Sequence, residues 1–195
     1  MRRKWVAVAV GGCLVVGLGL YAGDFFDEEV GSFGVQDVCE NLDPDREVVE
    51  KLRQVLPERG EYDFYAEGST GSKFGPYCHI RHEGKNLMTV LINYTDGSDP
   101  DAWLKRQVER KTAEGARFGW FKAGYGGVSS TGGGAIYLPC FKDHPEGLGS
   151  LSVSVNLRQG SRAAPKETKA AAEFLVRRAA AFAHKDAGCD LPSRL

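Results

Sequence analysis

The chain has 195 residues, with 25 basic and 26 acidic side chains and a net charge of −1 at pH 7. Such a balanced charge, without a basic stripe, excludes the usual nucleic-acid-binding proteins, and we expect no nucleic-acid partner. Hydrophobic residues form 42% of the sequence and aromatic residues 10%, which is enough for one ordinary packed domain.

The first element in the chain is a candidate membrane anchor. Residues 5–22 are uncharged and mostly apolar, and they follow the cationic start Met1–Lys4. As a helix this segment would be roughly 27 Å long, close to the thickness of the hydrocarbon layer of a membrane. Because basic residues precede the segment and acidic residues follow it, we expect a cytoplasmic N-terminus and an exported remainder.

Two other fates of this segment stay open. Cleavage as a signal peptide would need small residues before the cut, and Leu20 fits that pattern poorly, so we prefer an uncleaved anchor. Lipidation at Cys13 would need a polar exit, whereas apolar residues follow it. We therefore expect a single-pass protein of the cell membrane, held there through residues 5–22.

The segment after the anchor is predicted to be a tether. Residues 23–36 are rich in acidic residues and glycine, and we interpret Phe25, Phe26 and Phe33 as an aromatic belt at the membrane surface. The domain organisation predicted is then a cytoplasmic tip with the anchor (1–22), the tether and an extracytoplasmic domain (37–195).

Three segments of that domain carry helix signals. The first opens with Asp43 as the expected cap and Pro44 in the first turn, followed by an apolar stripe that ends at Leu56. The second opens with Asp99 and Pro100. The last runs from residue 165 to about residue 187, where charged and glycine residues end it.

Six segments carry strand signals, which are period-two alternation or enrichment in aromatic and β-branched residues. They are residues 62–66, 77–83, 87–94, 118–121, 135–141 and 150–157. In the last of them Leu151, Val153 and Val155 alternate with serines, which predicts one dry and one wet face. The order α-β-β-β-α-β-β-β-α predicts an α+β fold, a single twisted and mainly antiparallel sheet with two to three flanking helices.

The four cysteines outside the anchor are expected to form two disulfides. Cys39, Cys78, Cys140 and Cys189 are even in number and belong to a chain predicted to be exported. Their wide spacing does not match a zinc site, and we expect no metal. Helix-to-strand bridges favour the pairs Cys39–Cys78 and Cys140–Cys189; the nested pairing Cys39–Cys189 with Cys78–Cys140 stays open.

The chain carries no motif that assigns catalysis. The glycine-rich stretch 124–134 lacks the lysine and hydroxyl of a phosphate loop and leads into a strand, so we interpret it as a hairpin loop that could serve as a lid or contact surface. His79 and His82 are three apart on a strand and face opposite sides, so they cannot share one ion without a bend. We therefore assign no catalytic residue, metal or cofactor.

Aromatic residues around the glycine-rich stretch are the preferred ligand-binding candidates. Trp120 and Tyr125 flank its start and Tyr137 follows its end. Packing in the core is the alternative use of these rings.

The anchor, the four exported cysteines and a small α+β domain together resemble a group of actinobacterial cell-envelope domains of unknown function. The group includes lipoproteins and the extracellular sensor domains of membrane kinases. The resemblance covers Cys39 to Cys189 by layout and spacing. It implies a twisted antiparallel sheet flanked by helices, two disulfides and no catalysis, and it transfers no functional residue.

Three functions are compatible with these observations. The first is a binding domain of the cell envelope, whose partner is an envelope protein or a small ligand. The second is an extracytoplasmic hydrolase or isomerase with His79, His82 or His144 as base. The third is a scaffold subunit of an envelope complex, which predicts an exposed apolar patch.

Overall fold

The computed structural model describes residues 33–57, 61–68, 74–96, 99–113, 115, 117–143, 147–158 and 161–195. The predicted anchor and His144 lie outside these ranges. Within them, no helix has both the length and the apolar character that a membrane crossing requires.

Seven strands form one sheet in the order β1-β2-β3-β7-β6-β5-β4, and every neighbouring pair is antiparallel. The strands are β1 (Asp63–Glu67), β2 (Phe74–His82), β3 (Lys85–Thr95), β4 (Phe118–Phe121), β5 (Gly126–Ser130), β6 (Gly133–Pro139) and β7 (Ser150–Leu157). The α+β class and the antiparallel sheet are therefore confirmed.

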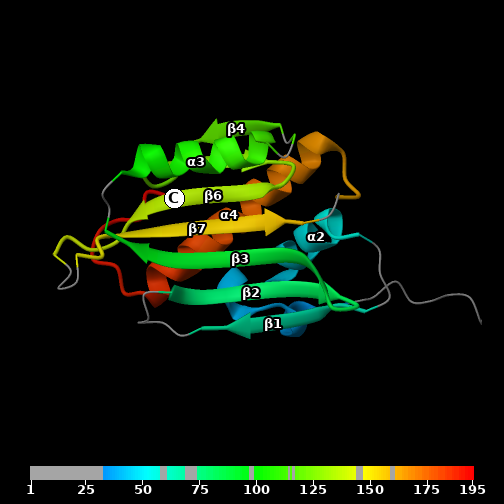
Figure 1. Ribbon diagram of the computed structural model, residues 1–195. Helices are drawn as coiled ribbons and strands as arrows, with labels where there is room; N and C mark the ends of the chain where they lie inside the picture. Colours follow the sequence, from blue (N-terminus) through cyan, green and yellow to red (C-terminus); the bar gives the residue numbers. More distant parts are fainter. Residues whose placement is uncertain are drawn as a thin grey trace, which may run out of the picture.

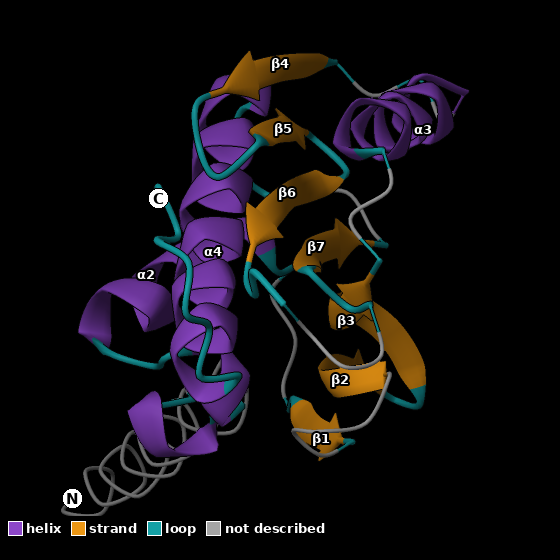
Figure 2. Cartoon of the chain, turned by 90° about the vertical axis from the view of Figure 1, so that its left-hand side faces the viewer, coloured by secondary structure: helices purple, strands orange, loops and turns teal. Residues whose placement is uncertain are grey.

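Three α-helices flank the sheet in the described part of the chain: α2 (Arg46–Val55), α3 (Pro100–Ala113) and α4 (Pro165–Asp186). Two short 3-10 turns, η1 (Val35–Asp37) and η2 (Glu40–Leu42), precede α2. α4 packs across β5, β6, β7 and β3, and α2 packs on α4, whereas α3 contacts β4, β5 and β6. Figures 1 and 2 show α3 on the opposite side of the sheet from α4 and α2.

The main core lies between the sheet and α4. The dry face predicted for β7 is confirmed, because Leu151, Val153 and Val155 are fully buried on the side of the core. The wet face predicted for its serines is wrong, since Ser150, Ser152 and Ser154 are 2%, 3% and 8% exposed. On α4 the buried stripe consists mostly of alanines, which bring the helix axis close to the strands. Small side chains on the helix and large ones on the sheet thus fill one layer.

One strand was not predicted. Between α3 and α4 the chain forms four strands instead of three, because the glycine-rich stretch interpreted as a hairpin loop contains β5, the start of β6 and the tight turn between them. A Cβ atom on Gly127 would lie 2.2 Å from the Phe121 ring, and one on Gly134 would lie 2.8 Å from the Ala172 carbonyl oxygen of α4. Glycine is needed there for close packing, and the missing side chains hide the strand periodicity.

Two details at the start of the domain differ from the prediction. Asp45, not Asp43, caps α2, since its Oδ1 accepts a hydrogen bond from the Val48 amide at 2.8 Å. Asp43 has a left-handed backbone with φ 49° and ends η2. Phe33 is not part of a surface belt: it is 5% exposed and packs against Tyr62 and Phe64.

The favoured disulfide pairing is confirmed. Cys39 bonds to Cys78 of β2 and Cys140 bonds to Cys189, which follows α4. The nested pairing is therefore excluded. One bridge connects the segment before α2 to β2, and the other connects the end of β6 to the end of α4.

Candidate functional site

The sheet has one region that none of the described helices covers. On the side facing away from α4, α3 covers β4, β5 and β6 only, and no helix lies in front of β1, β2 and β3 in Figure 1. We call this side of β1, β2 and β3 the open face. Its outward residues are Asp63, Tyr65 and Glu67 on β1, Tyr77, His79 and Arg81 on β2, and Thr89, Leu91 and Asn93 on β3.

A carboxylate and two tyrosines form the first group on the open face. The Tyr65 hydroxyl donates a hydrogen bond to Oε2 of Glu67 at 3.1 Å, and the Tyr77 hydroxyl donates to the same carboxylate. These bonds lower the pKa of Glu67, and they raise the pKa of Tyr77 to about 12 and that of Tyr65 in the same direction. At neutral pH Glu67 is therefore ionised, with its charge spread over two phenol donors.

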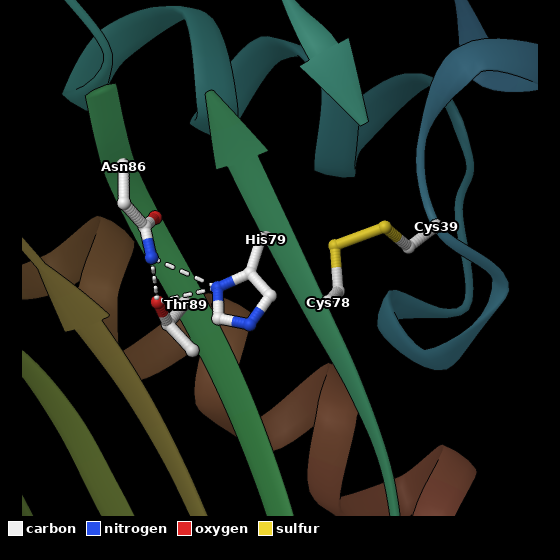
Figure 3. Close-up of a disulfide and its surroundings, with 5 residues drawn as sticks. All are labelled: Cys39, Cys78, His79, Asn86 and Thr89. Atoms are coloured by element: carbon white, nitrogen blue, oxygen red, sulfur yellow. Dashed lines mark hydrogen bonds between the residues drawn. A yellow bond between two sulfur atoms is a disulfide. The ribbon is translucent and has the colours of Figure 1, made fainter. Parts of the chain in front are cut away.

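His79 is the centre of the second group, with Asn86 and Thr89 of β3. The Asn86 Nδ2 lies 2.8 Å from the His79 Nδ1 and 2.9 Å from the Thr89 Oγ1, and the His79 Nδ1 lies 3.1 Å from that oxygen. Because the amide donates to Nδ1, the proton of the neutral imidazole belongs on Nε2. Figure 3 shows this group on the opposite side of β2 from the Cys39–Cys78 bridge.

Burial and positive charge both keep His79 neutral. Burial is the main cause that lowers the pKa of His79, and the charges of Arg81 and Arg158 lower it further. Protonation would also place an Nδ1–H against the Asn86 amide N–H. The Asn86 Oδ1, buried and without a hydrogen-bond partner, would have to turn toward the ring to accept that proton.

Three arginines lie around the end of the open face that carries His79 and Asn86. The Arg81 guanidinium lies over the Tyr65 ring, 5.5 Å from its centroid. Arg110 of α3 donates to the side-chain oxygens of Asn156, at 3.1 Å, and Gln107, at 2.6 Å. Arg158 directly follows β7, and its backbone amide donates to the Leu87 carbonyl at 2.8 Å.

The structure separates the three aromatic candidates. Tyr125 is 48% exposed and its ring centroid lies 6.0 Å from that of Tyr137, but Tyr137 is 2% exposed and packs under α3 against Trp103. Its hydroxyl is hydrogen-bonded to Thr95. Trp120 is 59% exposed on β4 and makes no ring contact with either tyrosine in the described part of the chain.

The two other histidines with described positions, His82 and His184, have structural partners. The His82 Nδ1 lies 2.7 Å from the Glu61 carbonyl oxygen, and its Nε2 lies 3.8 Å from the Glu83 carboxylate. The His184 Nε2 lies 2.8 Å from the Leu191 carbonyl oxygen. No group of three or more histidine, cysteine, aspartate and glutamate side chains is placed to hold a metal among the residues with described positions.

The chain was compared with protein-family models, curated proteins and solved structures, and none of them matches it. The site therefore has to be interpreted from its own chemistry.

Sequence reasoning missed most of the open face. The outward positions of β2 were visible as Tyr77, His79 and Arg81 at period two. The residues that lie beside them on β1 and β3 could not be identified from the sequence. The pairing of Tyr65 with His79 and of His79 with Thr89 depends on the strand registers. One signal in the sequence indicated the open face. Cys78 and Ile80 form an apolar face of β2, whereas His79 and Arg81 form a polar one.

Proposed function

We propose that this protein is a single-pass membrane protein whose extracytoplasmic domain binds a component of the cell envelope through the open face. The membrane placement rests on residues 5–22 and their charged flanks. Two disulfides support an oxidising compartment. The resemblance to actinobacterial envelope domains is consistent with this location, and we propose the same kind of environment for this chain.

One observation carries the binding function. A sheet face that only contacts solvent needs no more than scattered polar residues. On the open face the polar residues are joined to one another by hydrogen bonds. Tyr65 and Tyr77 share Glu67, and His79, Asn86 and Thr89 form a closed set of hydrogen bonds. Aromatic rings and oriented polar groups side by side are the usual composition of a recognition surface.

The geometry supports binding better than hydrolysis. In a nucleophile–histidine–acid triad the imidazole uses one nitrogen for the nucleophile and the other for the orienting group. Here Thr89 and Asn86 both contact the Nδ1 of His79, and Thr89 is 5% exposed. This arrangement fixes the ring without preparing the threonine for attack.

A scaffold function is the second candidate, and one observation favours it. Phe118 and Trp120 are 41% and 59% exposed at neighbouring outward positions of β4, which is an edge strand. Exposed aromatic side chains on an unpaired edge are typical of contact surfaces between proteins.

Site-directed photo-crosslinking separates these candidates. A photoreactive amino acid would replace Tyr65, Trp120 or, as a control on the far side of the molecule, Arg46 in the full chain expressed in its native membrane. We expect an adduct from position 65 and none from position 46. An adduct from position 120 alone would favour the scaffold. Recovery of the full chain in the soluble cytosolic fraction, with the thiols of Cys39, Cys78, Cys140 and Cys189 all free, would contradict the location.

A further inference from the structure

We propose that the end of the open face surrounded by Arg81, Arg110 and Arg158 binds an oxyanion, the phosphate or carboxylate group of an envelope ligand, with His79 as an additional donor. This inference rests on the proposed binding function and names the chemistry of its ligand. The four side chains come from β2, from α3 and from the residue that follows β7.

No carboxylate of the described residues forms an ion pair with these three guanidinium groups, although the charge of Glu67 acts on Arg81. The ion pairs between described residues involve Arg46, His82, Lys105, Arg177 and Arg178, but not Arg81, Arg110 or Arg158. Arg110 instead donates to two neutral amides. Guanidinium groups held in place without a carboxylate keep their paired N–H donors available for an oxyanion.

The registers bring these groups to one end of the sheet. His79 pairs with Thr89, and Thr89 pairs with Asn156, the residue that Arg110 contacts. Arg81 is two residues beyond His79 on the same side of β2. The pKa of His79 is lowered in part by Arg81 and Arg158, which means that both charges act on the ring.

The surface between the arginines is polar and neutral. Asn86, Thr89 and Asn156 supply amide and hydroxyl groups, and the Nδ1 of His79 is occupied by Asn86 and Thr89. Figure 3 shows the second ring nitrogen on the side of the ring away from these two partners. The Nε2–H is therefore the donor that His79 can offer to a ligand.

The nearby carboxylates do not cancel this positive charge. Glu67 accepts hydrogen bonds from the hydroxyls of Tyr65 and Tyr77, and its single charge acts on both Arg81 and His79. Two carboxylates, Glu67 and Asp63, stand against three guanidinium groups, so this end of the face keeps a positive charge. Asp63 is the cross-strand neighbour of Arg81, but it forms no ion pair with it within 4.0 Å. A cationic ligand would meet three guanidinium groups here, so the charges favour an anion.

The experiment follows the ring signals of His79 by NMR in the full chain, reconstituted in a zwitterionic membrane mimic. Inorganic phosphate and acetate are titrated separately, and vesicles of phosphatidylglycerol are added as a third probe. We expect phosphate or acetate to move the His79 signals and leave those of His184 in place. A response to the vesicles alone would identify a lipid headgroup as the source of the oxyanion.

Matched variants test the residues. Arg81→Gln and Arg110→Gln should each weaken binding about tenfold, because each removes charge-assisted hydrogen bonds. Arg81→Lys should weaken it less, since it keeps the charge but loses the planar fork. Asp63→Asn should strengthen binding, and Arg46→Gln, whose side chain is 92% exposed on α2, should change nothing.

The inference is overturned if none of the three probes moves the His79 signals, or if the arginine variants respond as the native chain does. The crosslinking at position 65 makes these failures separable. If the adduct at position 65 persists without an anion response, the binding function stands and only the oxyanion chemistry is wrong.

Discussion

The two halves of one sheet face have opposite characters. Under α3, the outward positions of β5 and β6 are Val128, Ala135 and Tyr137, which form a small apolar core with Leu104. On the open face, the corresponding positions of β1 and β2 carry tyrosine, glutamate, histidine and arginine. The same pleated surface is thus used once to attach a helix and once to present polar groups.

The difference shows that packing restricts the side chains under α3 but not those on the open face. A residue beneath α3 has to fill a defined volume, whereas a residue on the open face has only to keep its strand soluble. Solubility of the strands does not require the connected hydrogen bonds that the open face contains. Substitutions on the two halves of the sheet test this contrast.

A large difference between the two halves is expected from a pair of identical substitutions. Leu104→Ala removes a side chain that is 2% exposed between α3 and the sheet and should destabilise the domain by about 3 kcal/mol. Leu91→Ala on the open face should reduce stability by about 1 kcal/mol or less, because less surface leaves water there on folding. Urea unfolding measures both. Equal losses would mean that the open face is covered by a packed element.

The disulfides should affect the two halves separately. Replacing Cys39 and Cys78 by alanine, or Cys140 and Cys189, should lower stability by about 2–4 kcal/mol per bridge, since the loops closed span 39 and 49 residues.

Hydrogen exchange locates these effects. Loss of the Cys39–Cys78 bridge should increase exchange in β1 and β2, and loss of the other should increase exchange at the end of α4. The same exchange pattern for both variants would contradict a division of the sheet into two halves.

A pH effect is expected from His79 on the open face. Its pKa in the folded protein is lowered by burial and by Arg81 and Arg158, with Glu67 acting in the opposite sense. As the pH falls below the ordinary histidine value of about 6.5, the unfolded chain binds the proton first, so stability decreases with falling pH. Above that pH the histidine has no such effect.

The contribution of His79 is isolated with the variant His79→Gln. Stability measured by urea unfolding across this pH range should depend less on pH in the variant than in the native chain, while the carboxylates contribute equally to both. Identical slopes would mean that His79 titrates alike in the folded and unfolded states.

The smallest effect concerns the tyrosine and carboxylate group. In Glu67→Gln the pKa of Tyr77 should fall from about 12 toward the ordinary tyrosine value of about 10, because the phenol no longer donates to a negative charge. NMR of the tyrosine ring carbons follows this titration. Tyr125→Phe is the control, since it removes a phenol on the other half of the sheet. An unchanged pKa in the glutamine variant would show that Glu67 is not the partner.

The sequence by itself determined the class of the domain, the preferred disulfide pairing and, in the described part of the chain, the three helices and six of the seven strands. These features depend on local signals. The alternation in β7 and the proline and charged residues at the ends of α4 act over a few residues, so they can be interpreted without knowing what lies opposite.

The tertiary structure decided which strands are neighbours, and with that the candidate site. β3 pairs with β7 across 54 intervening residues, and this pairing brings Asn156 and Arg110 to the His79 end of the open face. It also decided that Gly127 and Gly134 belong to strands under a ring and a helix. A long-range contact is set by the fit of two distant surfaces, and the short-range pattern of either segment does not contain that fit.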